Sequence, residues 1–393
     1  MTKRRRLFDF ASPAFTFVFT LGVVNLFADV TYEGGGSLNG QFLAALGATA
    51  AATSFVAGLG EFLGYAVRAV SGHVADRTGR YWALTFLGYV VNLLAVPALA
   101  VAGSWPAAAV LMLAERVGRG IRKPTVEAML SYTTGTLGRG WVYALNTALD
   151  ETGATVGPLL MALVLWRGGT PRVAFAWLAI PAFLAIVSLA VARRRYPLPA
   201  RLEEGPTATV SGFGTPFRLF AVGAALFAAG LLSFELIGFH FASTGAVSPG
   251  AIPVLLALAT AGGVAANLVL GRLYDRFGVR VVFGAVAAAA GAAPLIFLGG
   301  RAALVAGMML WGVGYAVQDT LFKAIVAGLL PKGKRGLAFG LFYAGYGVGW
   351  LVGGIVAGLL YERSIGLMVG FSVAAELSSI PVLALASRAH AAP

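Results

Sequence analysis

Twelve apolar runs, each long enough to cross a lipid bilayer, constrain the fold of this chain more than any other feature of its sequence. About 20 apolar residues in a helix cross roughly 30 Å of hydrocarbon. Because backbone polar groups inside a membrane must be satisfied within the chain, the sequence predicts an all-α membrane protein with about twelve transmembrane helices. The runs fall near residues 12–32, 40–66, 82–102, 105–130, 141–166, 172–192, 215–239, 250–271, 281–299, 301–330, 336–360 and 365–387.

The balance of residue types excludes other classes of protein. Charged side chains make up 11% of the 393 residues, whereas a soluble protein carries roughly a quarter. The chain has no cysteine and three histidines, none close to another, so we predict no metal site and no cofactor. The formal net charge of +13 would suggest nucleic acid in a soluble protein. Here the basic residues gather in short loops between apolar runs, so we predict a lipid bilayer as the partner and no nucleic acid.

A polar segment divides the apolar runs into two sets of six. It begins with three arginines at residues 193–195 and continues through Glu203-Glu-Gly-Pro206; its proline and charge content are typical of an irregular linker. We therefore predict a first six-helix bundle over residues 1–192, a cytoplasmic linker over 193–214 and a second six-helix bundle over 215–393.

The distribution of lysine and arginine predicts the orientation. Counted from the N-terminus, the basic loops all fall on one side of the membrane, and the loops on the other side hold few basic residues. Loops rich in lysine and arginine remain in the cytoplasm. The sequence therefore predicts a protein of the plasma (inner) membrane with both termini in the cytoplasm.

A charged motif occurs once in each half of the chain. It reads Gly72-His-Val-Ala-Asp-Arg-Thr-Gly-Arg-Tyr-Trp82 in the first half and Gly271-Arg-Leu-Tyr-Asp-Arg-Phe-Gly-Val-Arg280 in the second. A repeated motif in so apolar a chain indicates two similar halves built from membrane helices. The matching residues lie at one constant offset of about 199 positions: Gly72 with Gly271, Asp76 with Asp275, Arg77 with Arg276, and Gly79 with Gly278.

The pattern G-x-x-x-D-R-x-G-R resembles the loop between helices 2 and 3 of the major facilitator superfamily, and the second copy falls between helices 8 and 9. The resemblance covers essentially the whole chain and implies two pseudo-symmetric bundles that transport a small solute by alternating access. Asp76 can accept hydrogen bonds from a helix N-terminus across the two halves, while Arg77 and Arg80 lie at the lipid headgroups. Both copies are therefore expected to gate the cytoplasmic side; plain basic loops are the alternative.

The fourth apolar run contains Glu115-Arg-Val-Gly-Arg-Gly-Ile-Arg-Lys-Pro124, and its R-x-x-x-G core resembles motif B of the same family. The resemblance implies that Arg116 influences the protonation of a nearby carboxylate. A guanidinium stays charged even in apolar surroundings and needs an acidic partner, for which Glu115, Glu127 and an acid on the first helix are candidates. The other basic residues of this stretch are expected to anchor its cytoplasmic end: Arg119, Arg122 and Lys123.

The fifth run contains Gly153-x-x-x-Gly157-Pro158, which resembles motif C of the drug:proton antiporters. A Gly-Pro step bends a helix and presents a smooth face to a neighbouring helix. The family pattern usually continues with a glycine pair, where this chain has Leu159 and Leu160. Close helix packing without a role in antiport is the alternative explanation.

Ionisable residues inside the apolar runs are the candidates for transport chemistry. A charge in hydrocarbon costs at least a few kcal/mol, so each should face a partner or an aqueous cavity. Burial disfavours the charged form of a carboxylate, which allows it to exchange protons near neutral pH. Glu33 is expected at the extracellular mouth, and structural ion pairs such as Glu61 with Arg68 are the alternative. The candidates are Asp29, ranked first, Glu61, Arg68, Arg116, Asp150, Glu235, Asp319 and Lys323.

The chain has no nucleotide-binding G-x-x-x-x-G-K-[ST] sequence and no G-x-S-x-G elbow. We therefore predict a monomeric secondary transporter and no enzyme activity. The motif C resemblance and the buried acids favour proton-coupled export, or antiport, of a cationic or amphipathic compound. Two alternatives remain: proton-coupled uptake of a nutrient or organic anion bound by Arg68 and Arg116, and a transport-inactive receptor.

Overall fold

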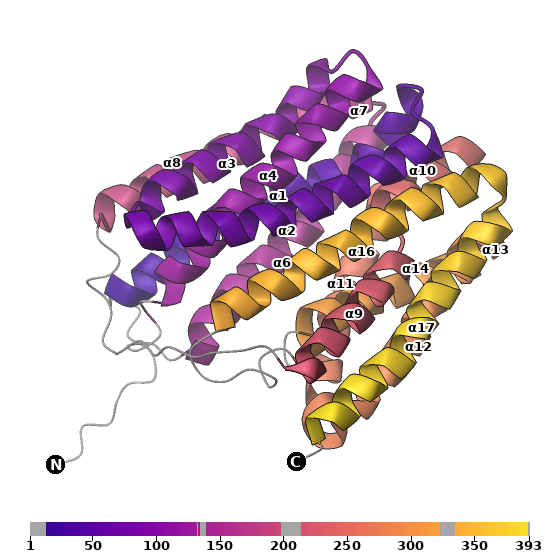
Figure 1. The fold of residues 1–393 in the computed structure, drawn as a ribbon. Helices are drawn as coiled ribbons and strands as arrows, with labels where there is room; N and C mark the ends of the chain where they lie inside the picture. Colours follow the sequence, from indigo (N-terminus) through magenta and orange to yellow (C-terminus); the bar gives the residue numbers. More distant parts are fainter. Residues whose placement is uncertain are drawn as a thin grey trace.

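A computed structural model describes residues 13–131, 133, 139–197, 214–322, 325 and 335–391. These residues form helices throughout, arranged as two neighbouring sets (Figure 1). The first set comprises α1 (Pro13–Ala45), α2 (Ala50–Thr78), α3 (Tyr81–Ala98), η1 (Leu99–Val101), α4 (Trp105–Ser131), α6 (Arg139–Trp166), α7 (Pro171–Trp177) and α8 (Ala179–Arg195). The second comprises α9 (Thr215–Gly230), α10 (Phe234–Thr244), α11 (Ala251–Phe277), α12 (Arg280–Ala290), α13 (Ala292–Leu298), α14 (Arg301–Ala316), η3 (Val317–Phe322), α16 (Arg335–Arg363) and α17 (Ile365–Ala391).

The fold class predicted from the sequence is confirmed. Within the described residues, 10 helical segments are long and apolar enough to span a membrane. Two further rods, α4 and α14 with its π-helical continuation η3, occupy the positions of the fourth and tenth predicted runs. The second half of α4 carries the charged sequence that begins at Glu115, so this rod is far less apolar than its neighbours.

The first helix is longer than the apolar pattern indicated. The gap between the first two predicted runs, 12–32 and 40–66, indicated a loop near residues 33–40, and this was wrong because α1 continues to Ala45. Its glycines serve as packing surfaces: a methyl group on Gly34 would lie 3.2 Å from the carbonyl oxygen of Gly157. Small residues allow membrane helices to approach closely without interrupting them. Glu33 therefore lies in the middle of α1, and its predicted place at the extracellular mouth was wrong.

The repeated motif forms two helix ends, and its expected form as a loop was wrong. Most of its residues belong to the last turns of α2 and α11: Gly72, Asp76 and Arg77 in the first copy, and Gly271, Asp275 and Arg276 in the second. Gly79 and Gly278 end these helices at the same φ of 64°, in the left-handed region where glycine is favoured. A charged helix end can stay helical because it reaches the polar membrane surface.

We expect the substitution Gly79→Ala to destabilise the protein by about 1–2 kcal/mol, because an alanine must adopt the left-handed conformation there. The thermal unfolding temperature of the detergent-purified protein should fall. Gly284→Ala on α12 is the matched control, because a methyl group at Gly284 meets no atom within 4 Å. Equal unfolding temperatures for the two variants would contradict this assignment.

Corresponding glycines pack corresponding helices in the two sets. Gly153 and Gly157 bring α6 onto α1, where a methyl group on Gly153 would lie 2.5 Å from the carbonyl oxygen of Leu26. Gly349 and Gly353 bring α16 onto the backbone of α9 in the same way. The structure thus shows close packing for the motif that includes Pro158, which lies inside α6.

The most extensive contacts between the two sets are those of α2 with α16, α1 with α10, and α6 with α11. One contact between α2 and α16 lies at the end far from the start of α1 and the end of α17 (Figure 1). There Gly358 packs against Ala51, and the backbone N–H of Ala51 donates a hydrogen bond of 3.0 Å to the Glu362 carboxylate. The predicted domain boundaries stay a prediction, since residues 198–213 lie outside the described part of the chain.

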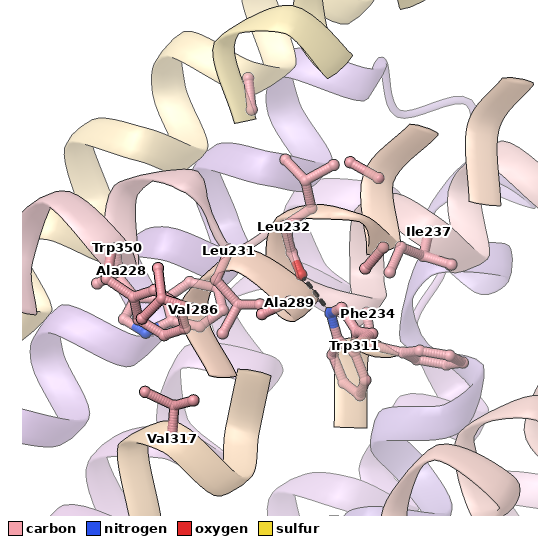
Figure 2. Close-up of a cluster of buried hydrophobic side chains, with 14 of the residues drawn as sticks. Ala228, Leu231, Leu232, Phe234, Ile237, Val286, Ala289, Trp311, Val317 and Trp350 are labelled. Carbon is pink, nitrogen blue, oxygen red and sulfur yellow. Dashed lines mark hydrogen bonds between the residues drawn. The ribbon is translucent and has the colours of Figure 1, made fainter. Parts of the chain in front are cut away.

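A break in the seventh predicted helix positions one acidic residue of the candidate site. The run predicted at 215–239 consists of α9 and α10, separated at residues 231–233 (Figure 2). Trp311 Nε1 donates a hydrogen bond of 2.7 Å to the carbonyl of Leu232, which the break leaves without a helical partner. Ser233 caps α10 by accepting from the N–H of Leu236. Glu235 consequently lies in the first turn of α10, where the helix dipole favours a negative charge.

Candidate functional site

A cavity of about 970 Å³ lies between the two sets. It extends from Arg116 and Glu235 in the interior to Gly72 and Glu127, toward the ends of α2 and α4. Among the described residues that line it, four are lysine or arginine, namely Arg68, Arg116, Arg119 and Lys123. Seven are carboxylates: Asp29, Glu33, Glu61, Glu127, Asp150, Glu151 and Glu235. The cavity is therefore acidic, although the chain as a whole is strongly basic.

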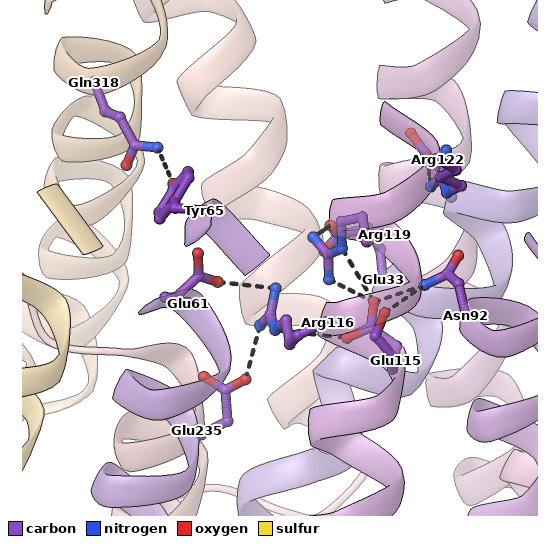
Figure 3. Close-up of polar contacts among 11 residues, drawn as sticks. Glu33, Glu61, Tyr65, Asn92, Glu115, Arg116, Arg119, Arg122, Glu235 and Gln318 are labelled. Carbon is purple, nitrogen blue, oxygen red and sulfur yellow. Dashed lines mark hydrogen bonds and ion pairs between the residues drawn. The ribbon is translucent and has the colours of Figure 1, made fainter. Parts of the chain in front are cut away.

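Arg116 links carboxylates of both helix sets (Figure 3). Its Nη1 lies 2.9 Å from Glu61 Oε1 on α2, and its Nη2 donates a hydrogen bond of 3.2 Å to Glu235 Oε1 on α10. Its Nε lies 3.5 Å from Glu115 Oε2. One guanidinium is thus shared among three carboxylates. Glu115 was an expected partner; the pair of Glu61 with Arg68, considered from the sequence, is not formed.

Arg119 lies beside Arg116 in the interior, and its expected role as an anchor at the helix end was wrong. It contacts Glu115 at 2.8 Å and Glu33 at 3.7 Å, and its guanidinium carbon lies 4.1 Å from the centre of the Tyr32 ring. Asn92 on α3 donates a hydrogen bond of 2.9 Å to the same Glu115 carboxylate. The i,i+4 spacing of Glu115 and Arg119 was the signal in the sequence that could have identified this pair.

A second charged cluster surrounds Asp29, which is 5% exposed. Arg122 is 4% exposed, so its expected role as an anchor was also wrong. Its Nη2 lies 3.9 Å from Asp29 Oδ1, and its Nη1 donates a hydrogen bond of 3.3 Å to the Tyr89 hydroxyl. The charge of Asp150 interacts with that of Asp29, and the charges of Lys123 and Glu127 interact with that of Asp150.

Asp150 is held in this cluster by a chain of amides. Asn146 donates a hydrogen bond of 3.1 Å to Asp150 Oδ2, and Asn25 donates one of 2.8 Å to Asn146. The Tyr89 hydroxyl donates in turn to Asn25. Among the described residues of this cluster, three carboxylates, Asp29, Asp150 and Glu127, face two cationic residues, Arg122 and Lys123.

Arg68 lies on α2, one turn beyond Tyr65, and lines the cavity. Its guanidinium carbon lies 5.0 Å from the Tyr65 ring centre and 6.0 Å from the Tyr343 ring centre. No ion pair of Arg68 occurs among the described residues. Tyr65 is fixed by Gln318 in η3, whose Nε2 donates a hydrogen bond of 2.7 Å to its hydroxyl. Sequence reasoning missed Gln318; π-helical turns are frequent at functional sites.

The structure describes only some of the remaining predicted residues. The side chain of Asp319 and the whole of Lys323 lie outside the described residues, as does the side chain of Asp76. Asp275, Arg77, Arg80 and Arg276 are exposed at the ends of α2 and α11. Their role in gating stays a prediction. Within the described residues, no group of His, Cys, Asp and Glu side chains is arranged to hold a metal ion.

Comparison with known proteins establishes the family. A model of the Major Facilitator Superfamily matches residues 219–388. An uncharacterized protein of Mycobacterium tuberculosis is 34% identical over 385 residues, covering 95% of this chain and 93% of that protein. An uncharacterized MFS-type transporter of Methanocaldococcus jannaschii is 23% identical over 364 residues, covering 88% of this chain and 89% of that protein. The chain belongs to the major facilitator superfamily.

Two further similarities concern a resistance protein and a solved structure. The fosmidomycin resistance protein of Escherichia coli is 33% identical over 145 residues, 36% of this chain and 34% of that protein. The crystal structure of the nucleoside transporter NupG superposes with a TM-score of 0.76 at 13% identity, covering 93% of this chain and 99% of that one. Membership of this family makes the protein a membrane transporter of small molecules and not an enzyme.

Proposed function

We propose that this transporter exports a cationic or amphipathic organic compound in exchange for protons. The observation that carries the proposal is the surplus of carboxylates over basic residues in the cavity between the two helix sets. Such a cavity attracts cations and protons from the side to which it opens. A protein named for fosmidomycin resistance matches 36% of this chain, which supports a role in resistance.

The exchange centres on Asp29 and Asp150. Because the carboxylates of their cluster outnumber Arg122 and Lys123, the cluster can accept either a proton or a cationic group of the substrate, but not both. Competition of the two for one charge is the condition for antiport. Substrate binding from the cytoplasm then displaces the proton, and proton binding from the outside displaces the substrate.

The orientation follows from the basic helix ends. Arg77, Arg80 and Arg276 lie on the same side as the start of α1, and positive loops remain in the cytoplasm. The cavity extends toward this side, while Ala51 and Glu362 help to close the other. The protein is then a plasma-membrane monomer in a cytoplasm-facing state, and the ends of α2 and α11 gate that side in the outward-facing state.

Proton release on binding tests the proposal directly. The detergent-purified protein is kept in unbuffered solution with a pH-sensitive dye. To it is added either 1-methyl-4-phenylpyridinium, an aromatic cation, or norfloxacin, an amphipathic compound with an ammonium group. We expect protons to be released, and we expect Asp29→Asn and Asp150→Asn each to abolish the release. Glu362→Gln is the control, because the amide can still accept the hydrogen bond from Ala51. Binding of either compound without proton release from the unmodified protein would contradict exchange.

The uptake of an organic anion is the second candidate, and Arg68 is the observation that favours it. Arg116 is a poor anion ligand, because Glu61 and Glu235 already occupy its guanidinium. If anions bind together with protons and the two cationic probes do not bind, uptake replaces export. A receptor without transport activity would bind a probe but move it in neither direction through a proteoliposome membrane.

A further inference from the structure

Glu376, on α17, carries a buried carboxyl group that the proposed exchange does not use. The residue is 2% exposed and does not line the cavity between the two sets. Its Oε2 is sealed from solvent and has no hydrogen-bond partner among the described residues, and no ion pair of Glu376 occurs among them. A buried polar group without partners needs a physical explanation.

Among the described residues, the helices packed on α17 bring no cation near Glu376. These helices are α9, α12, α13 and α16, and Glu376 lies near the middle of α17. The other charged residues and the histidine of these five helices lie in first or last turns: Arg218, Arg280, Arg335, Glu362, Arg363, Arg388 and His390. The tyrosines of α16 contact residues of other helices: Tyr343, Tyr346 and Tyr361.

A proton is the ligand that can neutralise Glu376 in this position. An isolated carboxylate inside a membrane helix bundle is strongly disfavoured, whereas the neutral carboxylic acid is tolerated at much lower cost. No ion or cargo molecule reaches Oε2 in this state, because the atom is sealed from solvent. A proton requires no room of its own.

Glu376 lies against the break between α9 and α10. Gly230 is the last residue of α9, and a methyl group on it would lie 2.6 Å from Glu376 Cγ. Ser372, one turn away on the same face of α17, donates a hydrogen bond of 2.7 Å to the Gly230 carbonyl. The α9 helix packs chiefly on α16 and α17 of its own set, whereas α10 packs chiefly on α1 and α2 of the other. A movement between the two sets is therefore expected to bend the chain at this break.

We propose that Glu376 is a proton-binding site outside the cavity, and that its proton stabilises the cytoplasm-facing state. Water reaches the carboxyl group only when α17 separates from the end of α9. The proton is retained while the break stays packed and is released when it opens, so proton occupancy and conformation are linked. This inference goes beyond the proposed function, because exchange at Asp29 and Asp150 does not require Glu376.

Infrared spectroscopy tests the protonation of Glu376, since the C=O stretch of a neutral carboxyl group differs in frequency from the stretches of a carboxylate. The protein is purified in a detergent without ester groups and measured at neutral pH. We expect a neutral-carboxyl band that Glu376→Gln loses. Glu362→Gln, which changes an exposed carboxylate, is the control and should keep this band. If Glu376→Gln keeps the band and loses carboxylate intensity instead, the inference is overturned.

Thiol labelling tests the link to conformation. The chain has no cysteine, so Ala69→Cys, at an exposed position of the cavity wall, reports the cytoplasm-facing state. At one alkaline pH we expect faster labelling when Glu376→Gln is added, because the amide stays neutral where the carboxyl group loses its proton. At acidic pH the two rates should be equal, and adding Glu362→Gln should change neither.

A second neutral variant guards against a folding defect of the first. Glu376→Met has an uncharged side chain of similar length and should reproduce both results. Equal labelling rates at alkaline pH with and without either neutral variant would overturn the link between the proton and the cytoplasm-facing state. Neither measurement uses a cargo, so a failure of the proposed function, seen as cargo binding without proton release, is distinguished from a failure of this inference.

Discussion

Arg116→Ala is expected to be the most damaging single substitution in this protein. It leaves Glu61, Glu235 and Glu115 facing one another in the interior without the guanidinium that they share. Removing one partner of a buried ion pair costs about 3–5 kcal/mol, because the remaining charge stays buried and unpaired. We expect a much lower thermal unfolding temperature for the detergent-purified protein and no transport in proteoliposomes.

Two further variants separate the loss of stability from the loss of transport. Arg363→Ala, at the exposed end of α16, should unfold at the temperature of the unmodified protein. Adding Glu61→Gln and Glu235→Gln to Arg116→Ala removes the unpaired charges, so it should restore much of the stability but not the transport. An Arg116→Ala protein as stable as Arg363→Ala would show that the shared guanidinium does not hold the two helix sets together.

Gly157→Val is expected to have the second-largest effect, through helix packing. The new β-carbon would lie 2.6 Å from the carbonyl oxygen of Val30 and 2.8 Å from the nitrogen of Gly34. Both are backbone atoms of α1, so the clash is relieved only if α6 moves away. Overpacking of this kind costs about 1–3 kcal/mol. We expect a lower unfolding temperature, together with impaired transport because α6 carries Asp150.

Gly36→Val is the matched control for this substitution. Gly36 lies on α1, and a β-carbon there would meet no atom within 4 Å. The two variants add the same side chain to the same pair of helices, so only Gly157→Val should unfold at a lower temperature. Similar unfolding temperatures would mean that α1 and α6 do not pack as closely as described.

The positions of the transmembrane rods could be predicted because apolar length alone determines them. The ends of the rods could not, because glycine has two roles that the sequence does not distinguish. Gly79 ends a helix at a positive φ, whereas Gly34 and Gly35 lie inside α1 and pack against other helices. In a soluble protein the triplet that they form with Gly36 would indicate a loop. In a membrane helix it provides room for a neighbour.

The sequence singled out some of the residues that line the cavity, but it did not predict how they pair. Arg116, Glu61 and Glu235 were all singled out, yet their ion pairs join positions that no local pattern connects, since Arg116 and Glu235 are 119 residues apart. Arg119 and Arg122 were misplaced because the sequence does not show how deep the charged half of α4 lies. Depth depends on the carboxylates that neighbouring helices contribute, and these are known only once the helices are packed.

Transport of norfloxacin by proteoliposomes tests the central claim most directly, namely that cavity carboxylates exchange a proton for a cationic group. Vesicles with an acidic lumen are placed in neutral buffer, and norfloxacin uptake is followed together with lumenal pH. We predict accumulation above the external concentration and faster alkalinisation of the lumen, both lost when a protonophore collapses the gradient and in Asp29→Asn and Asp150→Asn. Accumulation that survives both the protonophore and these substitutions would contradict proton exchange at this site.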